Sequence, residues 1–377
     1  MTNDLQKNLL QKNFTLKTTS FYNIHKQLNA KLVEFAGFEI PVSYTSIIQE
    51  HNAVRNSVGV FDVSHMGEIE VRGKDAFAFV NYVTTNDVSK LENGKVQYSA
   101  LCYDDGGIVD DLLVYHCGDY IQLVVNASNK DKDFEWLKSN AKNFSVELID
   151  KSDDISLLAI QGKNSLATLQ KISSVDLSQL EYYTFSFGKI AGVDALISRT
   201  GYTGELGFEL YFSAKENDSE KLWNAIFDAG KEFNIQPCGL GSRDSLRLEM
   251  GFCLYGNDID KTTTPLEASL GWITKLNKVD FIGKNILLQQ QTQGLKRKLV
   301  GFVLENEKAI PRQHYAIHSD GRHIGEVTSG TMSPTLNKGI GMGYVATEHS
   351  AIGNSIDIMI RNKQEKATIV KLPFIQK

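Results

Sequence analysis

The sequence predicts an α+β protein with antiparallel sheets, followed by a small all-β barrel or jelly roll at the C-terminal end. Two patterns support this prediction. Up to about residue 290, segments of alternating apolar and polar residues are mixed with segments of helical spacing. Past residue 295, short strands follow one another and are separated only by turn residues. The chain has 377 residues, too many for one simple core, so two or three domains are expected.

The first α+β unit follows from three alternating segments and one helical segment. The predicted elements are strands at 68–73, 119–126 and 144–149 and a helix over roughly 129–141. Phe134, Leu137 and Ala141 have the spacing of one helix face. Ser128 precedes them and is expected to cap the helix, because its hydroxyl can accept a hydrogen bond from a free backbone N–H.

A second α+β unit and the all-β tail follow. The second unit is expected to contain a buried strand at 155–160, a helix that begins near Asn164 and a helix over 219–234. In the tail, strands are expected within 298–306, 321–330, 339–345 and 354–361. Residues 319–322 (Ser-Asp-Gly-Arg) predict a hairpin turn, because Asp-Gly readily adopts positive φ angles.

Composition argues against several classes of protein. The net charge of -5 disfavours a general nucleic-acid binder, which is usually basic. No apolar run approaches the roughly 18–20 residues of a membrane helix. The start of the chain has no apolar stretch suited to a signal peptide, so a cytoplasmic location is expected. The four cysteines lack zinc-binding spacing and are expected to be reduced.

Common catalytic and phosphate-binding motifs do not occur in the sequence. The GLGSRD segment at 239–244 begins like a dinucleotide loop but lacks the third glycine and does not follow a strand. The GKNS segment at 162–165 lacks the first glycine of a phosphate loop. Neither H-E-x-x-H nor G-x-S-x-G is present, so hydrolase chemistry has no support and no metal site is expected.

Two adjacent acids, Asp110 and Asp111, interrupt the apolar strand-like run IVDDLLVY at 108–115. Adjacent residues of a strand face opposite sides, so the two carboxylates cannot share a face. Burying a carboxylate without a partner is costly. Either both acids are solvated where the strand starts beside Gly106 and Gly107, or one acid points into a site that needs it. The residues alone leave both alternatives open.

Residues 199–210 (RTGYTGELGFEL) combine glycines with aromatic rings and two carboxylates. Glycines let the backbone approach a ligand closely. An aromatic residue beside a carboxylate, such as Tyr202 and Glu209, suits a flat heterocycle with adjacent N–H donors, as in a pterin or a purine. The alternative is a plain hairpin with a surface glutamate.

Residues 239–256 predict a short helix with two arginines on one face. Ser242 is expected to cap this helix, which would end at Gly251. Arg243 and Arg247 are four residues apart and therefore share a face. An arginine in the first turn opposes the helix dipole, and this small cost is tolerable if the side chain reaches an anion. The alternative is that Arg243 pairs with a structural acid.

Together these motifs closely resemble the glycine cleavage system T-protein family of aminomethyltransferases. The resemblance runs in order from about residue 19 to the C-terminus. It rests on EFAGFEIPVSY (34–44), FDVSHMGEIEVRG (61–73), GGIVDDLLVY (106–115), VVNASNKDKD (124–133), SRTGYTGELGFEL (198–210), CGLGSRDSLRLEMGFCLYGNDID (238–260), TTPLEASLGW (263–272) and TSGTMSPTLNKGIGMGYV (328–345).

The resemblance implies a three-domain cloverleaf with a ferredoxin-like subdomain, a central folate channel and a C-terminal β-barrel. The implied divisions are a polar N-terminal extension at 1–18, a folate-binding region at 19–290 with subdomains of about 19–64 plus 153–290 and of 65–152, and a barrel at 295–377. The implied partner is the lipoylated H-protein, whose aminomethyl group supplies a one-carbon unit. The implied co-substrate is tetrahydrofolate, which becomes 5,10-methylenetetrahydrofolate while ammonia and the dihydrolipoyl arm are released.

The resemblance also implies roles for individual residues. Asp110, the first acid of the pair, would be catalytic: it would orient the folate near its reacting nitrogens and assist proton transfer as ammonia leaves. Asp111, on the opposite face, would be structural, and Asn126 would hydrogen-bond near Asp110. Glu209 would grip the pterin, and Arg243 would hydrogen-bond or brace the folate. The side chains implied to line the pocket are Tyr98, Tyr202 and Met66, and Arg247 is implied only as a neighbour.

The sequence departs from the family pattern in two places, and it leaves alternatives. The C-terminal LPFIQK lacks the tyrosine that some relatives place in the substrate site, and Lys163 stands where relatives often have proline. A folate-binding relative that supports iron–sulfur cluster assembly would carry K-G-C-Y-x-G-Q-E, which does not occur here. A dimethylglycine- or sarcosine-oxidising enzyme would need a flavin domain. A folate-dependent demethylase of a small sulfur compound is excluded less firmly.

Overall fold

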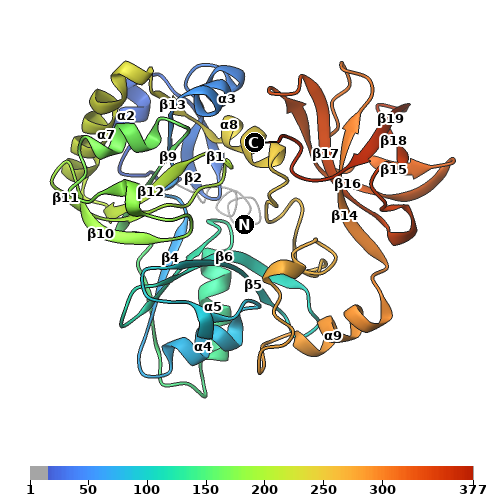
Figure 1. Ribbon diagram of the computed structural model, residues 1–377, viewed down its shortest axis with the longest axis horizontal. Coiled ribbons are helices and arrows are strands. Elements are labelled where there is room, and N and C mark those ends of the chain that lie inside the picture. Colours follow the sequence, from blue (N-terminus) through green and yellow to red (C-terminus); the bar gives the residue numbers. More distant parts are fainter. Residues whose placement is uncertain (1–15, 377) are drawn as a thin grey trace, which may run out of the picture.

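The computed structural model of the chain describes residues 16–376 and shows three lobes around a common centre (Figure 1). The N-terminal extension predicted over 1–18 lies almost wholly outside the described residues, and only its last three positions are placed. The first lobe holds a six-stranded sheet, the second a five-stranded sheet and the third a closed barrel. In Figure 1 the first lobe is at the upper left, the second at the lower left and the barrel at the right.

The sheet of the first lobe has the strand order β10-β11-β12-β9-β3-β13, with only β13 and β3 paired in parallel. Its strands are β3 (Gly59–Asp62), β9 (Ile155–Gln161), β10 (Phe185–Ile190), β11 (Val193–Ser198), β12 (Gly207–Ser213) and β13 (Gln236–Cys238). The helices of this lobe are α2 (Tyr22–Gln27), α3 (Ile47–Asn56), α6 (Ser165–Gln170), α7 (Glu216–Gly230) and α8 (Leu240–Glu249), and a two-stranded sheet of β1 (Lys31–Phe35) and β2 (Phe38–Ser43) adjoins them. Phe208, Leu210 and Phe212 of β12 pack with Leu222 and Ile226 of α7, so alternate residues of β12 are left to face the neighbouring lobe.

The second lobe is an antiparallel sheet of order β5-β6-β7-β4-β8. Its elements are β4 (Gly67–Arg72), α4 (Ala76–Val83), β5 (Val96–Cys102), β6 (Ile108–His116), β7 (Ile121–Val125), α5 (Lys130–Asn140) and β8 (Glu147–Asp150). Apart from β5, the chain runs β-α-β-β-α-β, which is the ferredoxin-like pattern. The strand predicted at 144–149 begins later, because Phe144 turns into the core and packs against Phe79 with ring centroids 5.3 Å apart.

The third lobe follows α9 (Lys284–Gln293) and is a closed barrel of order β14-β17-β16-β15-β18-β19. Its strands are β14 (Arg297–Leu304), β15 (Ala316–Ser319), β16 (Arg322–Ser333), β17 (Lys338–Ala346), β18 (Ser355–Ile360) and β19 (Lys363–Val370). Asp320 and Gly321 join β15 to β16 with φ angles of 49° and 74°, which confirms the predicted hairpin turn. Closure leaves no free sheet edge in the barrel.

Both predicted helix caps are wrong. Helix α5 begins after Asn129 and shows no side-chain cap, so Ser128 lies outside it. Helix α8 begins earlier than predicted, after Gly239, so Ser242 lies inside the helix. The Ser242 hydroxyl there bonds to the carbonyl of Gly239 at 2.9 Å and to the buried carboxylate of Glu50 at 3.3 Å. The predicted end of α8 is close to the observed one, since Gly251 follows with a φ of 69°.

A buried polar network joins the first lobe to the barrel. Glu249 at the end of α8 accepts hydrogen bonds from Arg55 of α3 at 2.8 Å and from Ser333 of β16 at 2.5 Å. The backbone N–H of Thr335 also donates to Glu249, at 3.1 Å. A buried carboxylate with several donors fixes the geometry of the elements that carry them. The network therefore holds α8 in place between two lobes.

These observations confirm the predicted α+β class with antiparallel sheets and a C-terminal barrel. The predicted domain boundaries remain a proposal. Within residues 16–376, no helix is both long and apolar enough to span a membrane.

Candidate functional site

The two adjacent acids of β6 point to opposite sides of the second lobe. Leu112 and Val114 pack in the core beneath α4 and α5, whereas Leu113 and Tyr115 pack in the seam between the first and second lobes. By strand alternation, Asp110 belongs to the helix side and Asp111 to the seam side. Val109 is an extra residue in the pairing of β5 with β6 and forms a β-bulge. The regular alternation of faces along β6 therefore begins at Asp110.

Asp110 is fully buried on the helix side. Its carboxylate accepts hydrogen bonds from the Asn126 backbone N–H at 3.0 Å, from Asn126 Nδ2 at 2.8 Å and from Asn129 Nδ2 at 2.6 Å. The expectation that Asp110 faces a substrate channel stays a prediction, but this geometry does not support a direct contact of Asp110 with substrate. Its side chain points toward α5 and has no exposed surface with which to meet a substrate.

Asp111 is the acid that faces the seam, and it is only partly buried. It accepts a hydrogen bond from the Tyr98 hydroxyl at 2.8 Å and another from Asn126 Nδ2 at 2.8 Å. Burial raises the pKa of Asp111 to about 7, and the nearby charge of Asp110 adds to the shift. The expectation that Asp111 is the merely structural acid thus fits the geometry poorly. Asn126, predicted to bond near Asp110, bridges both carboxylates.

The glycine-containing segment of 199–206 connects β11 to β12. Glu205 lies in this segment and Glu209 lies in β12, and the two glutamates have different surroundings. Glu205 pairs with Arg55 at 2.9 Å and so belongs to the network of the first lobe. Glu209 lies in β12 on the face turned to the seam, where it is 7% exposed and accepts a hydrogen bond from the Thr200 hydroxyl. Burial raises the pKa of Glu209, whereas Thr200 and the positive charge of Arg243 act in the opposite direction.

The two arginines of α8 have different surroundings. Arg247 pairs with Asp258 at 2.6 Å and with Asp244 at 2.8 Å, so it is the arginine that braces structural acids. The Arg243 guanidinium lies over the Tyr202 ring, 4.6 Å from its centroid. Within residues 16–376, Arg243 is in none of the ion pairs. It is therefore held by an aromatic face and keeps hydrogen-bond donors for another group.

Aromatic side chains connect the acid of β6 to the arginine of α8. The Tyr202 hydroxyl donates to the carbonyl of Cys253, and burial raises its pKa, an effect to which the charge of Asp111 contributes. Burial also raises the pKa of Tyr98, with Asp111 and Tyr202 as further causes. Asp111, Tyr98 and Tyr202 therefore lie within electrostatic reach of one another. Met66 packs at the seam with a cluster that includes Tyr115.

His65 is a candidate site residue that the sequence did not lead us to expect. It is 4% exposed, its Nδ1 has no hydrogen-bond partner in the described part of the chain, and it neighbours Met66 in the SHMGE segment. Burial lowers the pKa of His65 to about 4, and the positive charge of Arg243 adds to this effect. His65 is therefore a neutral ring beside Arg243 at pH 7. The clue in the sequence was a histidine inside a segment already singled out.

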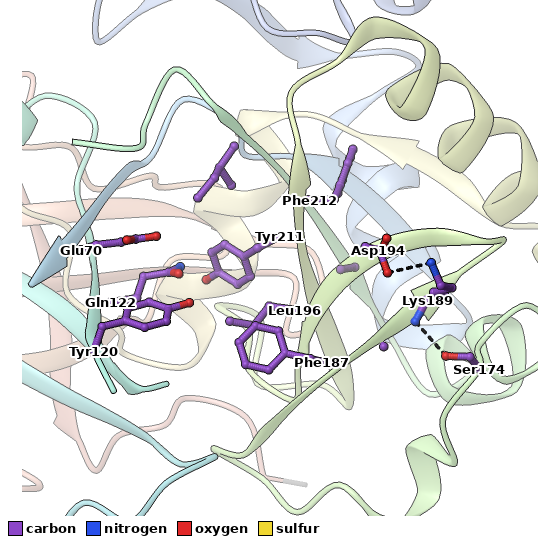
Figure 2. A pocket seen from close by; sticks show the side chains of 13 residues that line it. Glu70, Tyr120, Gln122, Ser174, Phe187, Lys189, Asp194, Leu196, Tyr211 and Phe212 are labelled. Carbon is purple, nitrogen blue, oxygen red and sulfur yellow. Dashed lines mark hydrogen bonds and ion pairs between the residues drawn. The ribbon is translucent and has the colours of Figure 1, made fainter. Parts of the chain in front are cut away.

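A line of hydroxyl groups leads along the seam from Glu209 to an outer groove. The Thr200 hydroxyl bonds to both Glu209 and Ser198, and the Tyr115 hydroxyl bonds to Ser198 at 3.3 Å and to Tyr211 at 2.9 Å. Tyr211 in turn lines a groove of about 680 Å³ between the two sheets (Figure 2). The acids and arginine described above are not among the residues that line this groove, so it lies beside the candidate site.

The described residues contain no group of three or more histidine, cysteine, aspartate or glutamate side chains arranged to hold a metal ion. The side chains present suit an organic ligand instead. Glu209 can accept hydrogen bonds from adjacent N–H groups, Tyr202 and Arg243 offer a flat surface, and Asp111 can exchange a proton near pH 7.

Comparisons with known proteins identify the family of this chain. The family model described as the GCVT N-terminal domain matches residues 21–278, and the model described as the glycine cleavage T-protein C-terminal barrel domain matches residues 297–376. The chain is 53% identical over 361 residues to an aminomethyltransferase of Halothermothrix orenii, covering 96% of this chain and 100% of that protein. It is 54% identical over 364 residues to an aminomethyltransferase of Chloroherpeton thalassium, covering 96% and 99%.

A solved structure agrees as well. The crystal structure of glycine cleavage system aminomethyltransferase T from Bartonella henselae superposes with a TM-score of 0.89 at 32% identity, covering 96% of this chain and 98% of that one. The family models cover both the sheet lobes and the barrel. The chain therefore belongs to the glycine cleavage T-protein family, which confirms the family and the aminomethyltransferase activity that the sequence predicts.

Proposed function

We propose that this aminomethyltransferase passes the one-carbon unit of an aminomethyl group, carried on the lipoyl arm of the H-protein, to tetrahydrofolate. The products are ammonia, 5,10-methylenetetrahydrofolate and the dihydrolipoyl arm. The observation that carries the proposal is Asp111: a partly buried carboxyl, held by Tyr98 and Asn126, whose pKa burial raises to about 7. The family depends on folate in general, and the use of tetrahydrofolate and H-protein by this chain is our proposal.

The reaction needs one group that both accepts and donates a proton. In one step a folate nitrogen loses a proton as it bonds to the one-carbon carbon, and the amine gains a proton as its bond to that carbon breaks. In the other step the second folate nitrogen bonds to the same carbon, the carbon–sulfur bond to the lipoyl arm breaks, and the proton of that nitrogen goes to the sulfur. A carboxyl with a pKa near the working pH can take the first proton and give the second. Asp111 has this pKa, whereas Asp110 is enclosed by donors. We therefore assign the proton transfer to Asp111 and not to Asp110.

The pterin ring of the folate would be held by Glu209, Tyr202 and Arg243. A carboxylate accepts hydrogen bonds from two adjacent N–H groups of such a ring, and an aromatic face and a guanidinium plane pack against it. His65, neutral beside Arg243, offers a further nitrogen with no partner in the described part of the chain. Tyr98 and Met66 keep their predicted place as pocket-lining residues in the proposal. Holding both substrates together contributes more than proton transfer alone.

The test is a direct assay of ammonia and methylenetetrahydrofolate from tetrahydrofolate and aminomethyl-loaded H-protein. Asp111→Asn should lower kcat by roughly 10²- to 10⁴-fold, the usual contribution of a positioned acid–base group, while tetrahydrofolate still binds. Asp131→Asn is the matched control, because Asp131 is an exposed acid of α5 whose carboxylate pairs with Lys130 at the surface. Near-normal turnover by Asp111→Asn would refute the assignment. Absence of product from the unchanged protein, with a competent H-protein, would refute the proposed reaction.

We also propose a cytoplasmic location. All four cysteines are free and buried, which suits a reducing compartment.

A further inference from the structure

A third acid lies behind Asp110, on the first turns of α5. Asp133 is fully buried, and neither of its carboxyl oxygens has a hydrogen-bond partner among the N–H and O–H groups of the described residues. An ionised carboxylate is almost never buried in this way, because losing its hydration is costly. The proposed proton transfer at Asp111 makes no direct use of Asp133. Its burial therefore needs a separate physical explanation.

The neighbours of Asp133 offer one candidate cation. Lys132 places its ammonium 3.7 Å from Asp133 Oδ1, which is too long for a hydrogen bond. That ammonium is instead directed to the carbonyl of Val109 at 2.5 Å and to the hydroxyl of Tyr255 at 3.2 Å. The side chain of Lys132 is also partly exposed, so water screens its charge. Lys132 therefore does not satisfy the Asp133 carboxyl.

The remaining neighbour of Asp133 is Asp110 itself, whose carboxyl lies within hydrogen-bonding reach. Two carboxyl groups can form a hydrogen bond only if one of them carries a proton. Asp110 already accepts three hydrogen bonds, from Asn126 and Asn129, which favour its ionised form. Asp133 receives none. The proton therefore belongs on Asp133, which donates it to Asp110.

We propose that Asp110 and Asp133 form a buried pair that shares one proton, with Asp133 as the donor, and that this pair positions Asp111 through Asn126. The inference rests on the proposed role of Asp111. Asn126 Nδ2 donates at 2.8 Å to Asp110 Oδ1 and at 2.8 Å to Asp111 Oδ1, so the orientation of Asp110 is passed to Asp111 through one amide. Asp110 and Asp133 are thus positioning residues behind the group that meets substrate.

Electrostatics supports the same distribution of charge. Burial, with the negative charge of Asp110, raises the pKa of Asp133 well above its usual range, whereas Lys132 works weakly against this. Burial also raises the pKa of Asp110, but the hydrogen bonds from Asp133, Asn126 and Asn129 lower it. The titratable groups that face the pair are Asp111 of β6, Lys132 of α5, Tyr103 of the β5–β6 turn and Tyr255 after α8.

The shared proton has a consequence for the reaction. Because Asp133 donates to it, Asp110 remains an anion close to Asp111 and disfavours a second anion there. This is one cause of the raised pKa of Asp111, after burial. If the donor at residue 133 were lost, Asp110 would become easier to protonate, and the carboxyl of Asp111 would ionise at lower pH.

The first experiment detects the proton without any substrate. Infrared spectra of the full-length protein near pH 7, in H₂O and D₂O, should show the C=O band of a buried protonated carboxylic acid, shifted by deuterium. Other carboxyls with raised pKa values, such as Asp111 and Glu68, add absorbance in the same region, so the test is a difference spectrum. The unchanged protein minus Asp133→Asn should contain this band, whereas the unchanged protein minus Asp131→Asn, the exposed neighbour on the same helix, should not. Absence of the band from the unchanged protein, or a difference spectrum for Asp133→Asn that lacks it, would overturn the proposal. Because no turnover is needed, a failure of the proposed reaction would not affect this result.

The second experiment follows the pH dependence of kcat. Asp133→Asn keeps a neutral side chain that can donate to Asp110, so the inflection assigned to Asp111 should stay in place. Asp133→Ala removes the donor and should move that inflection down by about 1 unit, the low end of the effect of one neighbouring charge. If Asp133→Asn moved the inflection as far as Asp133→Ala, Asp133 would be ionised and the pair would not share a proton. An unmoved inflection in a folded Asp133→Ala would show that the pair does not act on Asp111.

Discussion

Replacing Asp110 by asparagine should lower the pKa of Asp111 by an amount that the structure allows us to work out. Asp110 Oδ1 and Asp111 Oδ1 each accept from Asn126 Nδ2 at 2.8 Å, so they lie at most 5.6 Å apart (2.8 plus 2.8). At an effective dielectric constant of about 20, two unit charges at this separation repel by about 3 kcal/mol. Since one pKa unit corresponds to about 1.4 kcal/mol, Asp110→Asn should lower the pKa of Asp111 by about 2 units.

The sign follows from removing a negative charge, which favours ionisation of the remaining carboxyl. The pKa of Asp111 would fall from about 7 but stay above that of a solvated aspartate, because burial remains. The assay is kcat against pH, measured with H-protein and tetrahydrofolate at saturation, with Asp131→Asn as the control and circular dichroism to verify folding. An inflection that stays near pH 7 in a folded Asp110→Asn protein would show that Asp110 does not carry the charge assigned to it.

Three further predictions test other parts of the molecule. Glu209→Gln should weaken tetrahydrofolate binding by about 10- to 100-fold in a titration, because it removes hydrogen bonds to a charged acceptor. Gly107→Ala should lower the melting temperature, because the added Cβ would stand 2.1 Å from the carbonyl oxygen of Lys261 and the turn before β6 would have to move. Burial alone would raise the pKa of Glu249, but hydrogen bonds and the charge of His51 and other neighbours lower it to about 2. The Glu249 carboxylate should therefore contribute about 3 kcal/mol to the free energy of unfolding above pH 4.5, and this contribution should be lost as the pH falls toward 2. In Glu249→Gln, the free energy of unfolding, measured by urea titration at each pH, should depend less on pH over this range.

Much of the fold could be predicted because short segments of the sequence determine many of its strands and turns. Alternating residues marked the strands of both sheets, and the Asp-Gly pair at 320–321 marked a barrel hairpin correctly. The helix caps could not be predicted in the same way. Ser242 has the residue type of a cap, yet its hydroxyl bonds to Glu50, which is nearly two hundred residues away in the sequence. The start of α8 is therefore set by tertiary contacts that no local window contains.

The sequence indicated which residues belong to the candidate site, but it did not indicate which face of the β6 sheet is turned to that site. Tyr202, Glu209 and Arg243 were predicted to line one pocket, because an aromatic ring, a carboxylate and a guanidinium stand in unusual segments. The structure places Arg243 over the Tyr202 ring and within electrostatic reach of Glu209, and their contact with a ligand stays a prediction. Strand alternation showed that Asp110 and Asp111 must differ. It could not show which of them faces the seam, because that depends on which side α5 covers. The assignment of substrate contact to the first acid, which the family resemblance implied, stays a prediction, and the burial of Asp110 argues against it.

Two adjacent acids in an apolar strand therefore have one physical rationale, and it requires both faces of the sheet. A single carboxyl at the seam would be raised in pKa only by burial, and partial exposure limits that effect. A second carboxyl on the opposite face adds a fixed negative charge without occupying the space where substrate binds. That charge needs its own support in a fully buried position, which Asn126, Asn129 and the proton of Asp133 supply in the proposed arrangement. Since a helix must bring Asn129 and Asp133 beneath the strand, the acid pair of β6 and the sequence of α5 depend on each other.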